Sequence, residues 1–308
     1  MNLSHAYFRR WLTGIVVTLG AGLLLSGCST IANVGAVVGE TAGVITPQQG
    51  DSIRKTGEAV EKTFADITPE QEYYIGRAVG ATIVSKFKVY DNPQATEYIN
   101  LLGQTLALAS ARPETFGGWH FLILDSDEIN AFAAPGGFIF VSRGMLRLCK
   151  SEDDLAAVLS HEIGHVELQH ALRAIKGSRL TSALTILAVE GAKSFGGDAL
   201  SSLTEAFEGS ISDISNTMMN SGYARKQERQ SDEVAVRIMK GIGYDAHALP
   251  NVLTRMESQL KPGGHDFAAT HPPPKDRVKD LDSMLKKTPH VPVPAVRVQR
   301  FQEALAGI

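Results

Sequence analysis

The stretch LSHEIGHVELQH, residues 159–170, holds two histidines four positions apart, His161 and His165, with Glu162 beside the first. In a helix, residues at this spacing lie on one face, so the two imidazoles would converge on a single point. Zinc is commonly held in this way. Glu162, about a hundred degrees further round the helix, would lie beside the ion and take a proton from a water molecule that the ion holds.

A chance match on a solvent-exposed helix is the alternative explanation. It is weakened by the uncharged pair Ile163 and Gly164 inside the motif, and by apolar residues that mark a buried side of the helix: Leu155, Val158, Leu159 and Val166. A buried helix leaves little room for two imidazoles without a ligand. We therefore expect a bound metal.

A catalytic zinc needs a third protein ligand and an open fourth position. Residue type alone allows His170, Glu167, Glu190, Glu205, Glu208, Glu228, Glu233, His247, His265 and His271. His170, nine residues beyond His161, would point away on a continuing helix. Glu228 and Asp232 lie four apart on a second predicted helix, so Glu228 could bind zinc while Asp232 orients an imidazole. A surface salt bridge of Glu228 with neighbouring basic residues explains the spacing equally well.

The elements that must position these residues can be read from local signals. Thr68 followed by a proline predicts a helix start, with helices over 70–87 and 94–109. Short apolar runs predict strands at 119–124, 129–133 and 138–141, the last two joined by a glycine turn. Ser151 and three acidic residues predict the start of the helix that carries His161 and His165, called the active helix below. Further helices are expected over 223–240, 246–259 and 275–286.

The first residues have the features of a bacterial lipoprotein signal. Two arginines precede an apolar run that is shorter than the roughly 20 residues of a spanning helix, and Leu-Ser-Gly ends at Cys28. An uncleaved membrane anchor is the alternative. We expect a signal peptide at 1–27, lipid on Cys28 and a tether over 28–66, with Ser29 favouring the outer membrane facing the periplasm. The catalytic domain is predicted over 67–288 and an extended, proline-containing tail over 289–308.

The charge argues against a nucleic-acid-binding protein, and the cysteine content argues against an intramolecular disulfide. The net charge is -3 and no basic run occurs, which argues against nucleic-acid binding. If Cys28 carries lipid, the second cysteine, Cys149, has no partner within the chain. Its apolar neighbours predict a buried, inert thiol.

Several separated motifs resemble metallopeptidase family forty-eight, the gluzincin family of HtpX, the CAAX prenyl proteases and the Oma-type peptidases. They are HEIGH, Glu228-x-x-x-Asp232, NAFAAPGGFIFVSRGML, the 72–76 element and THPPPKDR at 270–277. The resemblance implies that His161, His165 and Glu228 bind zinc and that Glu162 is the catalytic base. Membrane-spanning helices are missing, which places the chain nearer the envelope lipoprotein branch. Ser231 stands where the family usually has alanine.

His271 and Arg277 stay open at this stage. His271 precedes three prolines on a loop that could reach the zinc, either as a fourth ligand or as a donor to the oxyanion. It could equally be a structural loop histidine, and Arg277 a charge at a helix start.

We expect an α+β, zincin-like fold, mostly helical, with a small sheet beside the active helix and one Zn²⁺ per chain. The predicted function is an envelope endopeptidase that cleaves unfolded or misassembled proteins. Its substrates would add as an extra strand along Asn130, Ala131, Phe132 and Ala133.

The alternative from another class is a lipid-anchored chaperone or binding module whose zinc site is capped. A structural lipoprotein with a coincidental motif is the third possibility. The oligomeric state is not predicted.

Overall fold

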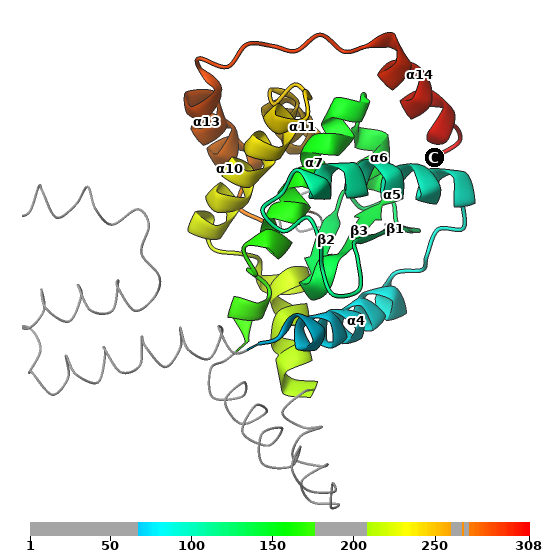
Figure 1. The fold of residues 1–308 in the computed structure, drawn as a ribbon, viewed down its shortest axis with the longest axis vertical. Helices are drawn as coiled ribbons and strands as arrows, with labels where there is room; N and C mark the ends of the chain where they lie inside the picture. Colours follow the sequence, from blue (N-terminus) through cyan, green and yellow to red (C-terminus); the bar gives the residue numbers. More distant parts are fainter. Residues whose placement is uncertain (1–66, 176–207, 260–266, 268–270) are drawn as a thin grey trace, which may run out of the picture. The chain divides into compact units, whose positions relative to one another are not determined.

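The structure is a computed structural model that describes residues 67–175, 208–259, 267 and 271–308. Cys28, the predicted signal and tether, Glu190, Glu205 and His265 lie outside the described residues. Contacts group Thr68–Ile308 as one unit, and this unit is described here. It is mostly helical with one small sheet, which confirms the predicted fold class (Figure 1).

The unit begins with two helices, α4 (Pro69–Lys86) and α5 (Pro93–Leu108). A capping box starts α4: the Thr68 hydroxyl accepts from the Gln71 N–H at 3.2 Å, and Gln71 Oε1 accepts from the Thr68 N–H at 2.9 Å. Asn92 caps α5 with a single bond, in which its Oδ1 accepts from the Ala95 N–H at 3.0 Å. Each helix has a proline in its first turn, where no intrahelical donor is lost.

The sheet has three strands in the order β1, β3, β2. β1 (His120–Leu124) runs parallel to β3 (Phe138–Ser142), and β2 (Ala131–Ala134) is antiparallel to it, with Phe132 opposite Phe140. The short 3-10 turn η2 (Pro135–Gly137) joins β2 to β3. Gly136 and Gly137 have φ of 76° and 97°, a left-handed conformation that glycine adopts without strain, so the predicted glycine turn is confirmed.

The α7 helix (Glu152–Glu167) is the centre of the unit and is buried along nearly its whole length. It packs against α5, β2 and two later helices, α10 (Arg225–Gly241) and α11 (Ala248–Gln259). The remaining elements are α6 (Arg143–Leu148), η3 (Leu172–Ala174), a helical stretch over 208–216 that continues into the π-helical turn η4 (Thr217–Ser221), and α13 (Pro274–Leu285). One apolar core joins the sheet to these helices.

The predicted extended tail at 289–308 is wrong from residue 295 onward. Ala295–Ala304 form the helix α14, and Phe301 enters the core with 9% of its surface exposed. The prolines that suggested an extended chain end at Pro294, which precedes the first turn of the helix, where proline is favourable. Arg300 forms an ion pair with Glu152 at the start of α7, so this segment is fastened to the active helix.

Candidate metal centre

The active helix presents its two histidines on one face. Ser151 caps α7 by accepting a hydrogen bond from the Asp154 N–H at 3.2 Å. His161 Nε2 and His165 Nε2 lie 3.1 Å apart, and each residue has 1% of its surface exposed. The predicted convergence of the two imidazoles is therefore observed.

Glu228 on α10 completes a triangle of donor atoms. Its Oε1 lies 3.4 Å from His165 Nε2, and its Oε2 lies 3.6 Å from His161 Nε2. Burial alone would raise the pKa of Glu228, but the neighbouring His271, His161, His165 and Arg277 lower it well below its usual range. Glu228 has 1% of its surface exposed, which excludes the alternative of a surface salt bridge.

Gly164 allows this approach between the two helices. A Cβ placed on Gly164 would lie 3.0 Å from both Cα and the carbonyl oxygen of Ser231, and 3.2 Å from Cβ of Val234. These contacts are tighter than packed atoms normally make. The glycine inside the HEIGH motif therefore sets the separation of α7 from α10, and with it the reach of Glu228 toward the histidines.

Asp232 and Arg277 lie behind His161. Asp232 Oδ1 is 2.9 Å from His161 Nδ1 and, as a carboxylate oxygen, can only accept, so Nδ1 is engaged by Asp232 and Nε2 faces the cluster. Arg277 donates to both carboxylate oxygens of Asp232, at 3.0 and 2.6 Å. Arg277 has 5% of its surface exposed, so it is more than a charge at the start of α13.

His271 joins the same cluster. Its ring stacks on Phe267 at 3.8 Å with an interplanar angle of 4°, and its backbone N–H donates to the Phe267 carbonyl at 2.8 Å. His271 Nε2 lies 3.7 Å from Glu228 Oε1. The ligand atoms of His161, His165, Glu228 and His271 all lie within 4.8 Å of one another, so four residues could hold a metal ion.

Glu162 is adjacent to the cluster and outside it. It has 1% of its surface exposed, and its Oε1 has no hydrogen-bond partner among the described residues. Burial raises the pKa of Glu162 to about 7 and outweighs the lowering by His161 and Arg277, while Glu228 adds a smaller increase. A carboxyl group with this pKa can accept and return a proton near neutral pH.

His170 is not a member of the cluster, as expected, but its expected direction away from the site is wrong. The helix ends at Glu167, and Gln169 has φ of 54°, which turns the chain back. His170 Nδ1 thereby lies 3.1 Å from His165 Nδ1 and 3.3 Å from the Ser231 hydroxyl. His170 orients His165 as Asp232 orients His161. Ser231, which stands where the family usually has alanine, contacts His170 and leaves the ligands in place.

Tyr223 is a second residue that sequence reasoning missed. Its ring stacks on His165 at 4.3 Å, and its buried hydroxyl has no hydrogen-bond partner within the described part of the chain. Burial, followed by Glu162 and Glu228, raises the pKa of Tyr223 well above its usual value, so the hydroxyl remains a donor. Its position five residues before Glu228 offered no spacing signal, because Tyr223 precedes α10 and does not share its helical register.

Glu72, the first residue of the 72–76 element, joins three separate parts of the chain. Arg112 donates to both oxygens of Glu72, at 3.0 and 2.9 Å, and the Gly136 N–H donates to Oε1 at 3.1 Å. Gln169, in the turn after α7, donates to Oε2 at 3.1 Å. Glu72 therefore ties the β2–β3 turn to the end of the active helix.

Other predicted residues lie as follows. β2 is an edge strand of the sheet, and Asn130 immediately precedes it, yet Asn130, Ala131, Phe132 and Ala133 have at most 4% of their surface exposed. Of the other candidate ligands that are described, Glu167, Glu208, Glu233 and His247 are not members of the cluster. Cys149 is buried, and burial raises its pKa above the usual range, as expected of an inert thiol.

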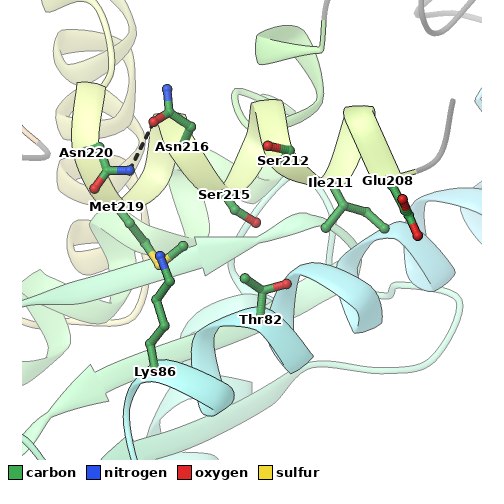
Figure 2. A pocket seen from close by; sticks show the side chains of 9 residues that line it. All are labelled: Thr82, Lys86, Glu208, Ile211, Ser212, Ser215, Asn216, Met219 and Asn220. Carbon is green, nitrogen blue, oxygen red and sulfur yellow. Dashed lines mark hydrogen bonds between the residues drawn. The ribbon is translucent and has the colours of Figure 1, made fainter. Parts of the chain in front are cut away.

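A pocket of about 390 Å³ lies between α4 and the 208–221 segment (Figure 2). Its lining is Thr82, Lys86, Glu208, Ile211, Ser212, Ser215, Asn216, Met219 and Asn220. None of the cluster residues lines it, so the chemistry indicated by the histidines is not located in this pocket.

Known proteins similar to this chain are peptidases, which agrees with a cluster of potential metal ligands. A model of Peptidase family M48 matches residues 93–285. The chain is 25% identical to the beta-barrel assembly-enhancing protease of Escherichia coli over 78% of its length and 49% of the relative's. It is 30% identical to the mitochondrial metalloendopeptidase OMA1 of Schizosaccharomyces pombe over 54% and 47% of the two chains. The chain thus spans about half the length of these curated relatives.

Among the described helices, none has the length and apolar character needed to cross a membrane.

Proposed function

The chain belongs to peptidase family M48, and on that basis we propose that it is a zinc-dependent endopeptidase of the bacterial cell envelope. Its substrates are unfolded or misassembled envelope proteins. The observation that carries the proposal is the convergence of His161, His165 and Glu228, with His271 beside them, inside a buried cluster.

The cluster fits zinc in its chemistry and spacing. Two imidazoles and a carboxylate are ligands that zinc prefers. The donor atoms of His161, His165 and Glu228 lie 3.1, 3.4 and 3.6 Å apart, near the separation of about 3.3 Å between ligands in a tetrahedral site with bonds of about 2.0 Å. Glu228 Oε2 lies 3.3 Å from Arg277 Nη1, and neither Glu228 oxygen has a hydrogen bond of ordinary geometry among the described residues, so this charged carboxylate could also bind a cation. His161, His165 and Glu228 would hold one ion per chain.

The protein side chains divide the chemistry of peptide hydrolysis among themselves. When bound, zinc supplies Lewis-acid polarisation at the scissile carbonyl. Glu162 takes a proton from the attacking water and passes it to the leaving amine nitrogen, a task suited to its raised pKa. The Tyr223 hydroxyl donates to the carbonyl oxygen as negative charge develops there. Asp232 and His170 keep the two imidazoles oriented.

Substrate binding is assigned to the β2 edge. Among the described strands, β2 pairs only with β3, so its other edge is where an extended peptide would add through backbone hydrogen bonds. Asn130 and Ala131 to Ala133 would form this edge. Because Phe132 has only 4% of its surface exposed, peptide binding at this edge would require a local rearrangement. Backbone recognition predicts loose sequence preference.

The N-terminal signal and the names of the relatives support the proposed cellular location. Lipid on Cys28 would anchor the chain, and the signal favours the outer membrane, facing the periplasm. The name of the Escherichia coli relative, a beta-barrel assembly-enhancing protease, is consistent with envelope proteins as substrates.

The second candidate function is a chaperone or binding module with a capped zinc site. The nearness of His271 to Glu228 favours it, because a fourth protein ligand would occupy the position that a catalytic zinc keeps open.

The two functions are distinguished by casein cleavage and zinc content of the full chain in detergent. The variant is Glu162→Gln, with Glu257→Gln, an exposed glutamate on α11, as the matched control. Zinc in all three proteins, with cleavage lost only in Glu162→Gln, supports the endopeptidase and Glu162 as its base. Absence of zinc from the parent would refute the metal site.

His271→Ala separates an active from a capped site. Zinc in the parent without cleavage, followed by cleavage in His271→Ala, would identify His271 as a cap. If neither protein cleaves casein and both keep zinc, the chaperone function is the better account. If His271→Ala lowers the activity of a cleaving parent, His271 assists catalysis.

A further inference from the structure

A second group of potential metal ligands lies outside the catalytic cluster. It consists of Asp245 and His247, between α10 and α11, and His290, between α13 and α14. One ligand atom from each lies within 4.8 Å of the others. We infer that these three residues form a second metal site, for Zn²⁺ or a chemically similar transition-metal dication.

Asp245 has one carboxylate oxygen fixed and the other directed at His290. Its Oδ1 accepts from the His247 N–H at 3.0 Å, while its Oδ2 lies 2.9 Å from His290 Nδ1. The Asp245 N–H donates to Asp153 Oδ1 at 3.2 Å, which anchors this loop to the first turn of α7. A cation would take the place of the proton shared by Oδ2 and Nδ1.

His247 is oriented as a metal ligand through its other nitrogen. Its Nε2 lies 2.9 Å from the Thr288 carbonyl oxygen, which can only accept, so Nε2 carries the proton and Nδ1 has the lone pair. Ligating histidines usually make such a bond to a backbone carbonyl. The His247 ring lies against the His290 ring, with centroids 4.0 Å apart and an interplanar angle of 28°, so the two planes would tilt apart on binding one ion.

The donor set selects the class of metal. Two imidazoles and one carboxylate suit zinc, nickel, cobalt or copper, whereas magnesium and calcium prefer oxygen donors throughout. The simpler explanation is an ordinary ion pair of Asp245 with His290, whose side chain is 72% exposed. That explanation leaves out the bond between His247 and Thr288, which fixes a second imidazole beside the same pair.

The position of this site predicts a fastening role. Asp153, which holds the Asp245 loop, is about 12 Å from His161 along α7, at 1.5 Å per residue, so the two sites are separate. Arg297 on α14 also donates to Asp153 Oδ1, at 3.1 Å. Metal at this site would join the segment that precedes α14 to the loop that precedes α11, and would secure α14 on the active helix.

The test is the zinc stoichiometry of the full chain in detergent after equilibrium dialysis against micromolar Zn²⁺. The parent is expected to bind two ions and His290→Gln one. His120→Gln is the matched control, because His120 is an exposed histidine that contacts the Gly117 carbonyl far along the chain from His290. His247→Gln provides a second loss of a ligand and is also expected to bind one ion. Raising the zinc concentration should increase the Tm of the parent further than that of His290→Gln.

Equal zinc content in the parent, His290→Gln and His247→Gln would overturn the inference. An equal loss in His120→Gln would do the same, because it would indicate nonspecific binding by surface histidines. A second ion that binds the parent only at millimolar zinc would identify adventitious binding. Casein cleavage does not enter this test, so its outcome is independent of the proposed peptidase activity.

Discussion

Asp232 Oδ1 lies 2.6 Å from Arg277 Nη2 and 2.9 Å from His161 Nδ1, so one carboxylate joins a buried arginine to a candidate metal ligand. Both Asp232 and Arg277 are nearly excluded from solvent. Burial alone would raise the pKa of Asp232, but Arg277 and then His161 lower it, so the carboxylate is ionised. The orientation of His161 therefore depends on a charge pair contributed by two other helices.

Arg277→Ala should destabilise the chain strongly, because it leaves the Asp232 charge buried without its partner. Breaking a buried pair in this way costs about 3–5 kcal/mol of unfolding free energy. Urea unfolding of the full chain measures this, with Arg225→Ala as the control. Arg225 pairs with Asp276 at the surface, where such pairs contribute about 0–1 kcal/mol. Equal losses in the two variants would contradict the assigned role of Arg277.

Gly164→Ala should push α10 away from α7. In an exposed helix this substitution stabilises by about 1 kcal/mol, but here the added Cβ meets Ser231 backbone atoms, and overpacking costs about 1–3 kcal/mol. We expect lower stability and weaker zinc retention against a chelator. Gly241→Ala is the control, because no atom lies within 4 Å of a Cβ placed there. Unchanged zinc retention would show that the helix separation does not set the reach of Glu228.

Glu152 should make stability depend on acid pH. Burial would raise the pKa of this carboxyl, but hydrogen bonds from Arg300, Tyr244 and Tyr98 lower it below its usual value of 4.5. A depressed pKa in the folded state stabilises the fold above the unfolded pKa, and this contribution is lost as pH falls through the folded value. Glu152→Gln should therefore lower unfolding free energy at pH 7 and differ less from the parent at acid pH. Glu97→Gln, an exposed glutamate on α5, should show no such convergence.

Tyr223→Phe should lower kcat by about 100-fold while leaving KM and zinc content unchanged, since removing one oxyanion donor costs about that factor. The lost hydroxyl would act only as charge develops in the transition state. Tyr74→Phe, which changes a half-exposed tyrosine on α4, is the control and should retain parental kcat. Loss of zinc from Tyr223→Phe would instead indicate that the tyrosine supports His165 structurally.

Much of the fold could be predicted from the sequence because its signals are local. Thr68, Asn92 and Ser151 are caps whose partners lie three residues away, and the two glycines between β2 and β3 require no distant information. The α14 helix was missed because prolines nearby outweighed the pattern that follows Pro294. Its packing includes the contact of Arg300 with Glu152, 148 positions earlier.

The site shows the same division between local and distant information. The spacing of His161 and His165 could be read directly, whereas Glu228 could not be separated from a surface glutamate until α10 was packed on α7. His170 was misplaced because a continuing helix was assumed, and the turn at Gln169 has no proline or glycine to announce it. His271 reaches the cluster through a loop, for which helical or strand periodicity offers no guidance.

The ion-pair network at the start of α7 has a consequence for the order of folding. Glu152 receives hydrogen bonds from Tyr98, Tyr244 and Arg300, which are 54, 92 and 148 positions away. Each contact closes a long loop, whose entropy must be lost before the contact can form. The active helix can therefore form early as a local element, but its buried acidic end can be neutralised only after the distant segments assemble. We expect this end of the helix to be the late step in reaching the native state.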